Sequence, residues 1–270
     1  MRMDRGYRVE RFSANREMVA AASTVNREAN TIHLVTEADV TEPRRFLAQH
    51  RDRTGKRLSF TAYVVACLAR TFDGFPEFNA FRKGRRLIVL DDLAISVPLE
   101  RRIDGERVPD PFVIHEANRK GFRQIHEELR AAQGQASQRL GAVSGTTWVR
   151  YIPPPLLRSF VRWASRNIGM QKRFGVVGVT AVGMFGSGPM WLVPLTHATV
   201  TVAVGSIAAR PALVEGVWEE RKHLCLTVSF NHDLIDGAPA ARFTGRFTEL
   251  LANGEVLSDG VRETAKETSS

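Results

Sequence analysis

Ser229-Phe230-Asn231-His232-Asp233-Leu234-Ile235-Asp236-Gly237 contains an H-x-x-x-D-G pattern, and the residues around it indicate which structure it occupies. Upstream, apolar residues alternate with other residues from His223 to Phe230, which is the period of a strand with two different faces. Downstream, apolar residues recur at helical spacing from Ala240 to Leu251, and Asn253-Gly254 ends the helix. The pattern therefore lies at a strand-to-loop-to-helix corner, where Gly237 permits a tight backbone path.

His232 is the candidate catalytic residue at this corner. A histidine there can be held by its own backbone and accept a proton, so acyl transfer is the first chemistry to consider. Asp236 follows four residues later, near enough to brace the loop without touching the imidazole. Two alternatives stay open: His232 can be a hydrogen-bonded structural residue, and Asp236 can cap the following helix.

The composition narrows the class of protein. The chain has 270 residues, 43% of them hydrophobic, which is enough for a packed core. Its first residues are charged, so we expect no secretory signal. Cys67 and Cys225 both lie in apolar runs, which predicts buried, reduced thiols and a cytoplasmic location.

The formal net charge of +9 favours anionic partners, which include nucleic acid, a membrane surface and a phosphorylated cofactor such as coenzyme A. Because the arginines are spread along the chain and no nucleic-acid-binding module accompanies them, nucleic acid is the least favoured of these partners. No C-x-x-C pair or H-x-x-x-H spacing is present, so the sequence predicts no metal site.

Phe174–Ala209 contains no Asp, Glu, Lys or Arg and is long enough to span a membrane. However, five glycines and two prolines interrupt its first part, and Thr199–Val204 is rich in β-branched residues. We therefore predict two buried strands joined by a glycine-rich loop in place of a transmembrane helix.

The remaining elements occur in a mixed order. An amphipathic segment at 8–28 opens the chain; we expect strands at 32–37, 86–90 and 93–97, a helix from Thr41 to Gly55, a buried helix capped by Ser59, and a charged surface helix within 114–133. Strands and helices do not alternate strictly, which favours an α+β sandwich over a doubly wound sheet.

We predict a single catalytic domain over residues 1–254, followed by a polar tail at 255–270. Within the domain, 134–173 is an atypical insert, because aromatic residues such as Trp148 and Trp163 mix there with several arginines. Such a segment can lie on an anionic membrane or cover a pocket that receives an apolar acyl chain. It can also simply pack against the domain or a neighbouring subunit.

Several ordered stretches together resemble the catalytic domain of the dihydrolipoamide acyltransferases of 2-oxoacid dehydrogenase complexes, and more distantly chloramphenicol acetyltransferase. The similarity runs from about Arg11 to Leu251 and is carried by Leu34–Thr41, Phe75–Ala80, Val179–Gly186 and His232–Gly237. The resemblance implies a chloramphenicol acetyltransferase-like two-layer α+β sandwich, in which helices flank a mixed β-sheet.

The resemblance also implies roles for individual residues. His232 matches the catalytic base, which would deprotonate an acceptor that attacks the thioester of acyl-coenzyme A. Thr180 matches a serine or threonine that donates a hydrogen bond to the tetrahedral oxyanion, although it can also bond a backbone carbonyl as an ordinary strand residue. Asp236 matches a residue that pairs with an early arginine, and Arg16 is the best candidate by position. No residue is assigned to coenzyme A binding.

The chain departs from the family pattern in two ways. The dehydrogenase-complex enzymes usually have Asp-His-Arg at the motif, whereas this sequence has Asn231-His232-Asp233, which weakens the inference that lipoamide is the acceptor. No lipoyl domain or attachment site is recognised on the chain, so a role in such a complex would need a separate lipoyl-carrier protein.

The resembling families form trimers whose active sites lie between neighbouring subunits. The polar C-terminal residues here lead us to predict a homotrimer that does not assemble further. The leading hypothesis is direct transfer of an acyl group from acyl-coenzyme A to a thiol, hydroxyl or amine. The alternative is a catalytically weak trimeric scaffold or regulatory homologue of a dehydrogenase-complex core.

Overall fold

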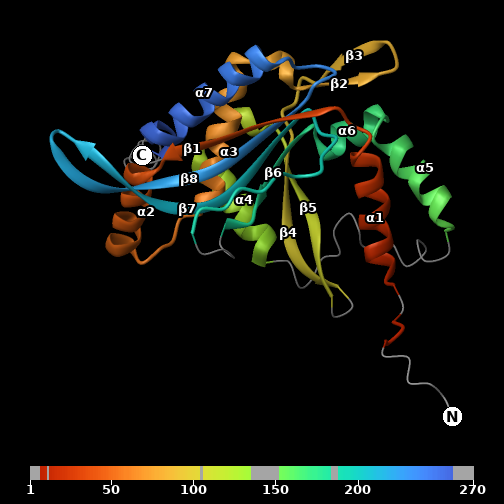
Figure 1. The fold of residues 1–270 in the computed structure, drawn as a ribbon, viewed down its shortest axis with the longest axis horizontal. Helices are drawn as coiled ribbons and strands as arrows, with labels where there is room; N and C mark the ends of the chain where they lie inside the picture. The colour runs from red at the N-terminus through yellow and green to blue at the C-terminus, as the bar shows by residue number, and fades with distance from the viewer. Residues whose placement is uncertain (1–6, 11, 104–105, 135–151, 184–187, 258–270) are drawn as a thin grey trace, which may run out of the picture.

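The computed structural model describes residues 7–10, 12–103, 106–134, 152–183 and 188–257. Its main feature is a six-stranded mixed sheet with the strand order β1-β8-β7-β6-β4-β5, accompanied by a separate ribbon of β2 and β3 (Figure 1). The strands are β1 (Thr31–Asp39), β2 (Ala80–Lys83), β3 (Arg86–Val89), β4 (Ile95–Ile103), β5 (Glu106–Ile114), β6 (Val177–Ala181), β7 (Val200–Val214) and β8 (Val217–Asn231). The helices are α1 (Ala14–Asn26), α2 (Thr41–Thr54), α3 (Phe60–Thr71), α4 (Phe122–Gly134), α5 (Pro154–Ala164), α6 (Ile168–Phe174) and α7 (Gly237–Asn253), with short 3-10 turns at Phe72–Gly74, Pro76–Phe78 and Ala117–Arg119.

Helices α3, α4 and α7 pack on one face of the sheet and complete one hydrophobic core with it. Helix α3 is buried over most of its length, and its Tyr63 hydroxyl donates to the carbonyl oxygens of Leu250 (3.2 Å) and Leu251 (2.9 Å) in α7. The predicted α+β sandwich and the predicted buried helix capped by Ser59 are therefore confirmed.

Residues 188–198 lie against the opposite face of the sheet. The Trp191 indole N–H donates to the carbonyl oxygen of Thr36 on β1 (3.0 Å), and the backbone of Met190 passes close to Gly205 on β7. A Cβ atom at position 205 would lie 2.0 Å from the Met190 carbonyl oxygen, so only glycine fits there. This cover explains why Cys225, Thr227 and Ser229 on the second face of β8 are buried too.

Strands β4 and β6 pair over only two positions, Ile95 with Val177 and Ser96 with Gly178. Beyond them β4 continues beside β5 alone, while β6 continues beside β7. Pro98 has no N–H group with which to extend the ladder on β4. The sheet is therefore open next to the last residues of β6.

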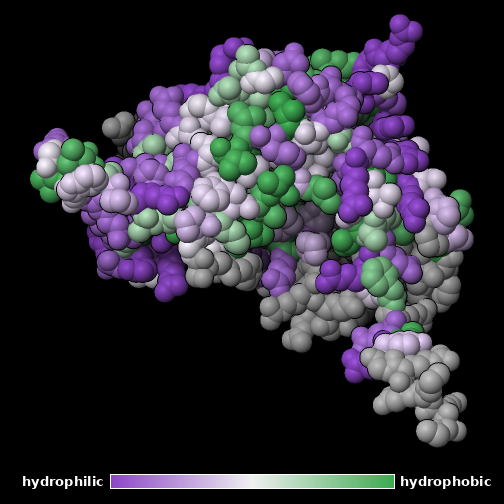
Figure 2. Space-filling model, viewed as in Figure 1, coloured by the Kyte–Doolittle hydropathy of each residue, from purple (hydrophilic) through white to green (hydrophobic). Residues whose placement is uncertain are grey.

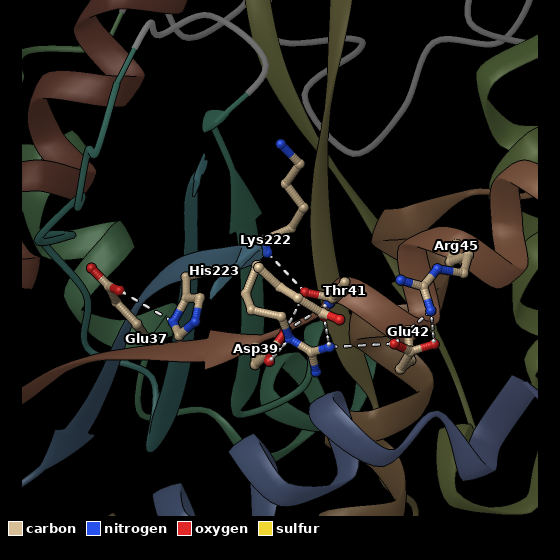
Figure 3. A network of polar contacts seen from close by, with 9 residues as sticks. Glu37, Asp39, Thr41, Glu42, Arg45, Lys222 and His223 are labelled. Atoms are coloured by element: carbon tan, nitrogen blue, oxygen red, sulfur yellow. Dashed lines mark hydrogen bonds and ion pairs between the residues drawn. The ribbon is translucent and has the colours of Figure 1, made fainter. Parts of the chain in front are cut away.

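A network of polar side chains fixes the other end of the sheet, where β1 leads into α2 (Figure 3). The Asp39 carboxylate accepts hydrogen bonds from the backbone (2.9 Å) and hydroxyl (2.6 Å) of Thr41 and from Arg221 Nε (2.9 Å). The Thr41 hydroxyl in turn accepts a bond from the backbone N–H of Lys222 on β8 (2.8 Å). Asp39 and Thr41 come from Leu34–Thr41, one of the stretches that resembles the acyltransferases, and with Arg221 and Lys222 of β8 they hold β1, β8 and α2 together.

Most local predictions are confirmed. The structure contains the strand expected at 32–37 and the helix that Gly55 ends in a left-handed conformation. Of the two strands expected in the uncharged stretch Phe174–Ala209, β6 lies inside it and β7 begins there but continues to Val214. In the described part of the chain, no helix has both the length and the apolar character needed to cross a membrane. Cys67 and Cys225 are buried free thiols, as predicted, and burial raises the pKa of Cys67.

Other features were not predicted. The strand expected at 86–90 is β3, but its partner β2 and strand β5 were missed. Helix α4 is more than a surface helix because its Phe122, Ile125 and Leu129 are in the core. Strands β7 and β8 form a long hairpin whose turn at Glu215-Gly216 has positive φ at both residues. The domain extends to at least Leu257, which is buried, whereas we placed the start of the polar tail at 255.

The atypical insert is described from residue 152 onward, and 135–151, which includes Trp148, lies outside the described residues. Helix α5 packs on α1 through Leu157, which contacts the small buried cluster around Ala21, and Arg162 forms an ion pair with Glu28. Packing against the domain is thus one role of the insert. Its Leu156 and Trp163 side chains are exposed, and contact with a membrane stays a prediction.

Candidate active site

His232 lies in the short loop between β8 and α7 and is held at its backbone and at its ring. Its backbone N–H donates to the carbonyl oxygen of Asn30 (2.7 Å), in the turn before β1. Its ring Nδ1 lies 3.0 Å from the carbonyl oxygen of Ile235, which can only accept a hydrogen bond. Nδ1 must therefore carry the proton, and Nε2 keeps a free lone pair on a side chain that is 47% exposed. We expected the backbone of His232 itself to hold the ring. The acceptor is instead the carbonyl of Ile235, three residues further on.

Asp233 supplies a second attachment for this loop. One carboxylate oxygen accepts a hydrogen bond from the Asn30 amide (2.8 Å), and the other pairs with Arg82 of β2 (3.0 Å). The acid that departs from the family pattern is thus engaged by two partners and fixes the loop to the β2–β3 ribbon. Neither Asn30 nor Arg82 was predicted as a site residue from the sequence.

Asp236 and Arg16 do not form the predicted ion pair within the described part of the chain. Asp236 is the residue before α7, its side chain is 86% exposed, and it forms no hydrogen bond that caps the helix. Its carboxylate lies 3.8 Å from His232 Nδ1. Arg16 is exposed on the first turn of α1, where its backbone N–H donates to the Ser13 side chain (3.3 Å). The attachment expected of this pair is provided by Asp233, Asn30 and Arg82.

Thr180 is on β6, and the alternation of the strand decides which way it faces. Val177 and Val179 point into the core between sheet and helices, so Gly178 and Thr180 lie on the opposite face. Thr180 pairs with Ala203, which pairs with Thr227, so His232 lies five residues beyond this rung and two strands away. At about 3.3 Å per residue and about 4.8 Å per strand, the two backbones are on the order of 19 Å apart. One chain therefore does not bring Thr180 and His232 together.

A cavity of about 520 Å³ opens beside Thr180, next to the gap between β4 and β6. Its walls are residues of β6, the segment 192–198, and α5 and α6 of the insert. Figure 2 shows hydrophobic side chains around a hollow on this face of the molecule. His197 lies at its edge, where Nδ1 is 2.6 Å from the Asn26 side-chain oxygen, and desolvation lowers the pKa of this histidine.

The surface next to His232 has a different character. The β2–β3 hairpin carries Arg82, Lys83, Arg85 and Arg86, all exposed. A second cavity, of about 500 Å³, is lined by three of these arginines together with Asp233 and Leu234 of the histidine loop. Glu77 also lines this cavity, but the three arginines outnumber its carboxylates, so the cluster is a candidate for holding an anionic group such as a phosphate. No group of three or more potential metal ligands occurs in the part of the chain that the structure describes.

Comparison with known proteins gives a consistent result. The family model for the 2-oxoacid dehydrogenases acyltransferase (catalytic domain) matches residues 5–144 and 171–258 and leaves 145–170 unmatched. The chain is 25% identical over 222 residues to the dihydrolipoyllysine-residue acetyltransferase component of the pyruvate dehydrogenase complex of Cupriavidus necator, covering 80% of this chain and 34% of that protein. It is 25% identical over 213 residues to the dihydrolipoyllysine-residue succinyltransferase component of the 2-oxoglutarate dehydrogenase complex of Staphylococcus saprophyticus, covering 77% and 42%.

Solved structures agree on the fold. A probable dihydrolipoamide acetyltransferase from Listeria monocytogenes superposes with a TM-score of 0.68 at 20% identity, over 91% of this chain and 94% of that one. The dihydrolipoamide acetyltransferase of Azotobacter vinelandii gives 0.69 at 20% identity, over 95% and 97%. The chain spans between a third and a half of the length of the curated relatives named above. From the extent of the family match, the chain belongs to the 2-oxoacid dehydrogenase acyltransferase (catalytic domain) family.

Proposed function

We propose that this chain transfers an acyl group from acyl-coenzyme A to a thiol, hydroxyl or amine acceptor, with His232 as the general base. The observation that carries this proposal is the state of the imidazole. Since Nδ1 donates to the Ile235 carbonyl, the exposed Nε2 is the atom that can accept a proton. Family membership supports the same chemistry.

The acyl group passes directly from coenzyme A to the acceptor, without an acyl-enzyme intermediate. The acceptor gives its proton to His232 Nε2 while its sulfur, oxygen or nitrogen forms a bond to the thioester carbonyl carbon. The carbonyl oxygen becomes an oxyanion that accepts a hydrogen bond from the Thr180 hydroxyl. The carbon–sulfur bond to coenzyme A then breaks, and the departing thiolate takes the proton back from the imidazolium.

Because His232 and Thr180 are far apart in one chain, the proposal requires two subunits at each site. A homotrimer in which His232 of one copy faces Thr180 of the next would complete it. The Azotobacter vinelandii enzyme supports the choice of residues, since a serine, a histidine and an asparagine were studied for their role in its catalytic mechanism. They have the same sequence spacing as Thr180, His232 and Asp236, with aspartate here in place of the asparagine.

The substrates follow from the charge of the site. The phosphates of acyl-coenzyme A match the arginines of the β2–β3 hairpin beside the histidine loop. The relatives are named for dihydrolipoyllysine residues, so a dihydrolipoyl group on a separate carrier protein is the first acceptor to test. Because Asp233 replaces the family's arginine, small-molecule acceptors belong in the same screen.

The test is release of coenzyme A by the purified protein, with His232→Gln as the variant. Removal of the base lowers kcat by about 10²- to 10⁴-fold. His115→Gln is a matched control, because this side chain is 49% exposed and pairs with Asp92 away from the loop. Light scattering measures whether each variant remains a trimer. Turnover by His232→Gln equal to that of the parent would overturn the assignment, and a trimer that binds no acyl-coenzyme A would identify a scaffold.

A further inference from the structure

Part of the wall of the Thr180 cavity comes from residues that the family model does not match. Val161, Ala164, Ser165 and Met170 line the cavity and lie within 145–170. This wall is fixed in place, because Leu157 on the same helix is buried against α1 and Arg162 pairs with Glu28. Residues outside the family match therefore help to shape this cavity.

The cavity is uncharged. None of the described residues that line it is Asp, Glu, Lys or Arg, and desolvation lowers the pKa of His197, which disfavours the charged form of its ring. The lining is largely apolar, with Val161, Met170, Phe174, Val179 and Leu192 among its members. A carboxylate or phosphate placed here would lose its hydration without gaining an ion pair.

The cavity is also large for a small acyl group. Its volume of about 520 Å³ lies within the range of about 300–1,000 Å³ found for pockets that enclose drug-sized ligands. An acetyl group would leave most of this space to water, whereas each methylene buried in it is favourable. The size and the lining both match an extended apolar group.

The proposed reaction indicates which part of the substrates enters the Thr180 cavity. Three groups meet at the carbon whose oxygen bonds to Thr180: the acceptor, the coenzyme A sulfur and the acyl tail. The acceptor must reach His232, and coenzyme A carries phosphates that find no cation in this cavity. The acyl tail is the group with neither requirement, and it starts one bond from the oxyanion carbon.

We infer that the Thr180 cavity receives the acyl tail, and that this chain prefers an uncharged acyl group much longer than acetyl over acetyl or succinyl. Residues 161–170 of the insert set that preference. The inference rests on the proposed function and specifies the donor for the same site.

The first measurement compares acetyl-, octanoyl- and succinyl-coenzyme A on the full chain. Calorimetry gives their dissociation constants without any acceptor, and coenzyme A release with free dihydrolipoamide gives kcat/KM. Burial of each methylene is worth about a fourfold gain. Octanoyl-coenzyme A should therefore be preferred over acetyl-coenzyme A by at least about 100-fold, and succinyl-coenzyme A should be the poorest. Equal constants for the three thioesters would overturn the inference.

The second measurement fills the cavity from the insert. Ala164→Phe on α5 and Met170→Trp on α6 should each lower the preference for octanoyl over acetyl by at least about tenfold. Ser159→Phe is the matched control, because it adds the same ring to an exposed position of α5 that does not line the cavity. An unchanged preference in both filled variants, or an equal loss in the control, would contradict the role of the insert.

The outcomes separate the two proposals. If the thioesters are bound equally while His232→Gln abolishes release, the acyl preference fails and the proposed function stands. If His232→Gln changes nothing, the proposed function fails, and calorimetry alone decides whether the cavity selects long acyl tails.

Discussion

The cavity beside Thr180 and the surface beside His232 differ in their charge. The former is lined by apolar and neutral residues, whereas the latter carries Arg82, Lys83, Arg85 and Arg86 from a single hairpin. The proposed donor has two unlike ends that match this difference. An acyl-coenzyme A has an anionic nucleotide at one end and an acyl tail at the other, and the reactive carbonyl lies between them.

The largest expected effect tests whether the Thr180 region of one copy of the chain and the His232 region of another act on the same carbonyl group. Thr180→Val removes the oxyanion donor and should lower kcat by about 10²- to 10³-fold. When this variant is unfolded and refolded with an equal amount of His232→Gln, random trimers contain intact sites at about one quarter of positions. Coenzyme A release should recover to about that fraction of the parent rate.

Each variant refolded alone is the control for this mixing experiment. Mixed protein that is no more active than the two variants separately, although light scattering finds trimers, would show that His232 and Thr180 do not share a site across an interface.

The cationic region can be tested by removing its charge. Arg85→Gln combined with Arg86→Gln should raise KM for acyl-coenzyme A by about tenfold, with the effect falling on KM more than on kcat. The difference from the parent should shrink as salt is added, because exposed charges are screened. The matched control is Arg51→Gln with Arg53→Gln on α2, which are also exposed but lie at the far end of the fold. An equal rise of KM in the control would remove the hairpin from the proposed donor site.

The smallest expected effect lies outside both regions, in the network of Asp39, Thr41 and Arg221. Burial opposes ionisation of Asp39, but hydrogen bonds from Thr41 and Arg221 outweigh it and lower the pKa of this carboxyl. Its stabilising contribution is therefore present above the unfolded-state pKa of about 3.9 and is lost as the pH falls through the lower folded-state pKa. Asp39→Asn should lower the free energy of unfolding by about 1–3 kcal/mol at pH 7, and less below pH 4.

Urea unfolding at pH 7 and pH 3 checks this prediction. The control is Glu42→Gln in the same network, whose carboxylate is 52% exposed and should contribute less than about 1 kcal/mol. A difference between Asp39→Asn and the parent that stays constant with pH would contradict the assignment of the shift to this network.

The local elements could be predicted because their signals lie within a few residues. Gly55 ends α2 with a positive φ of 70°, and the Ser59 side chain accepts a hydrogen bond from the Ala62 backbone. In the second half of β8, large apolar residues alternate with smaller or polar ones in the sequence. Strand β5 was missed because Pro109 and Pro111 interrupt its pattern. Both are tolerated because β5 is an edge strand, and strand order is not visible in the sequence.

The site was predicted only in part, because some of its contacts join residues that are far apart in the sequence. His232 and Thr180 were found because their stretches resemble a known family. The residues that hold the histidine loop, Asn30 and Arg82, are about 200 and 150 positions away and have no local pattern. Arg16 was assigned to Asp236 by its position, and the fold instead supplies Arg82 to the neighbouring Asp233.

The short pairing between β4 and β6 has a mechanical consequence. The β4–β5 ribbon is joined to the other four strands of the sheet by two rungs of hydrogen bonds, at Ile95 and Ser96. Amide protons of β4 beyond Ser96 should therefore exchange with solvent faster than those in the middle of β7 and β8, because fewer bonds must break to release them. Because Val97 and Leu99 keep β4 packed in the core, we expect this loosening only along the edge that faces β6, where Ser96 and Pro98 line the cavity.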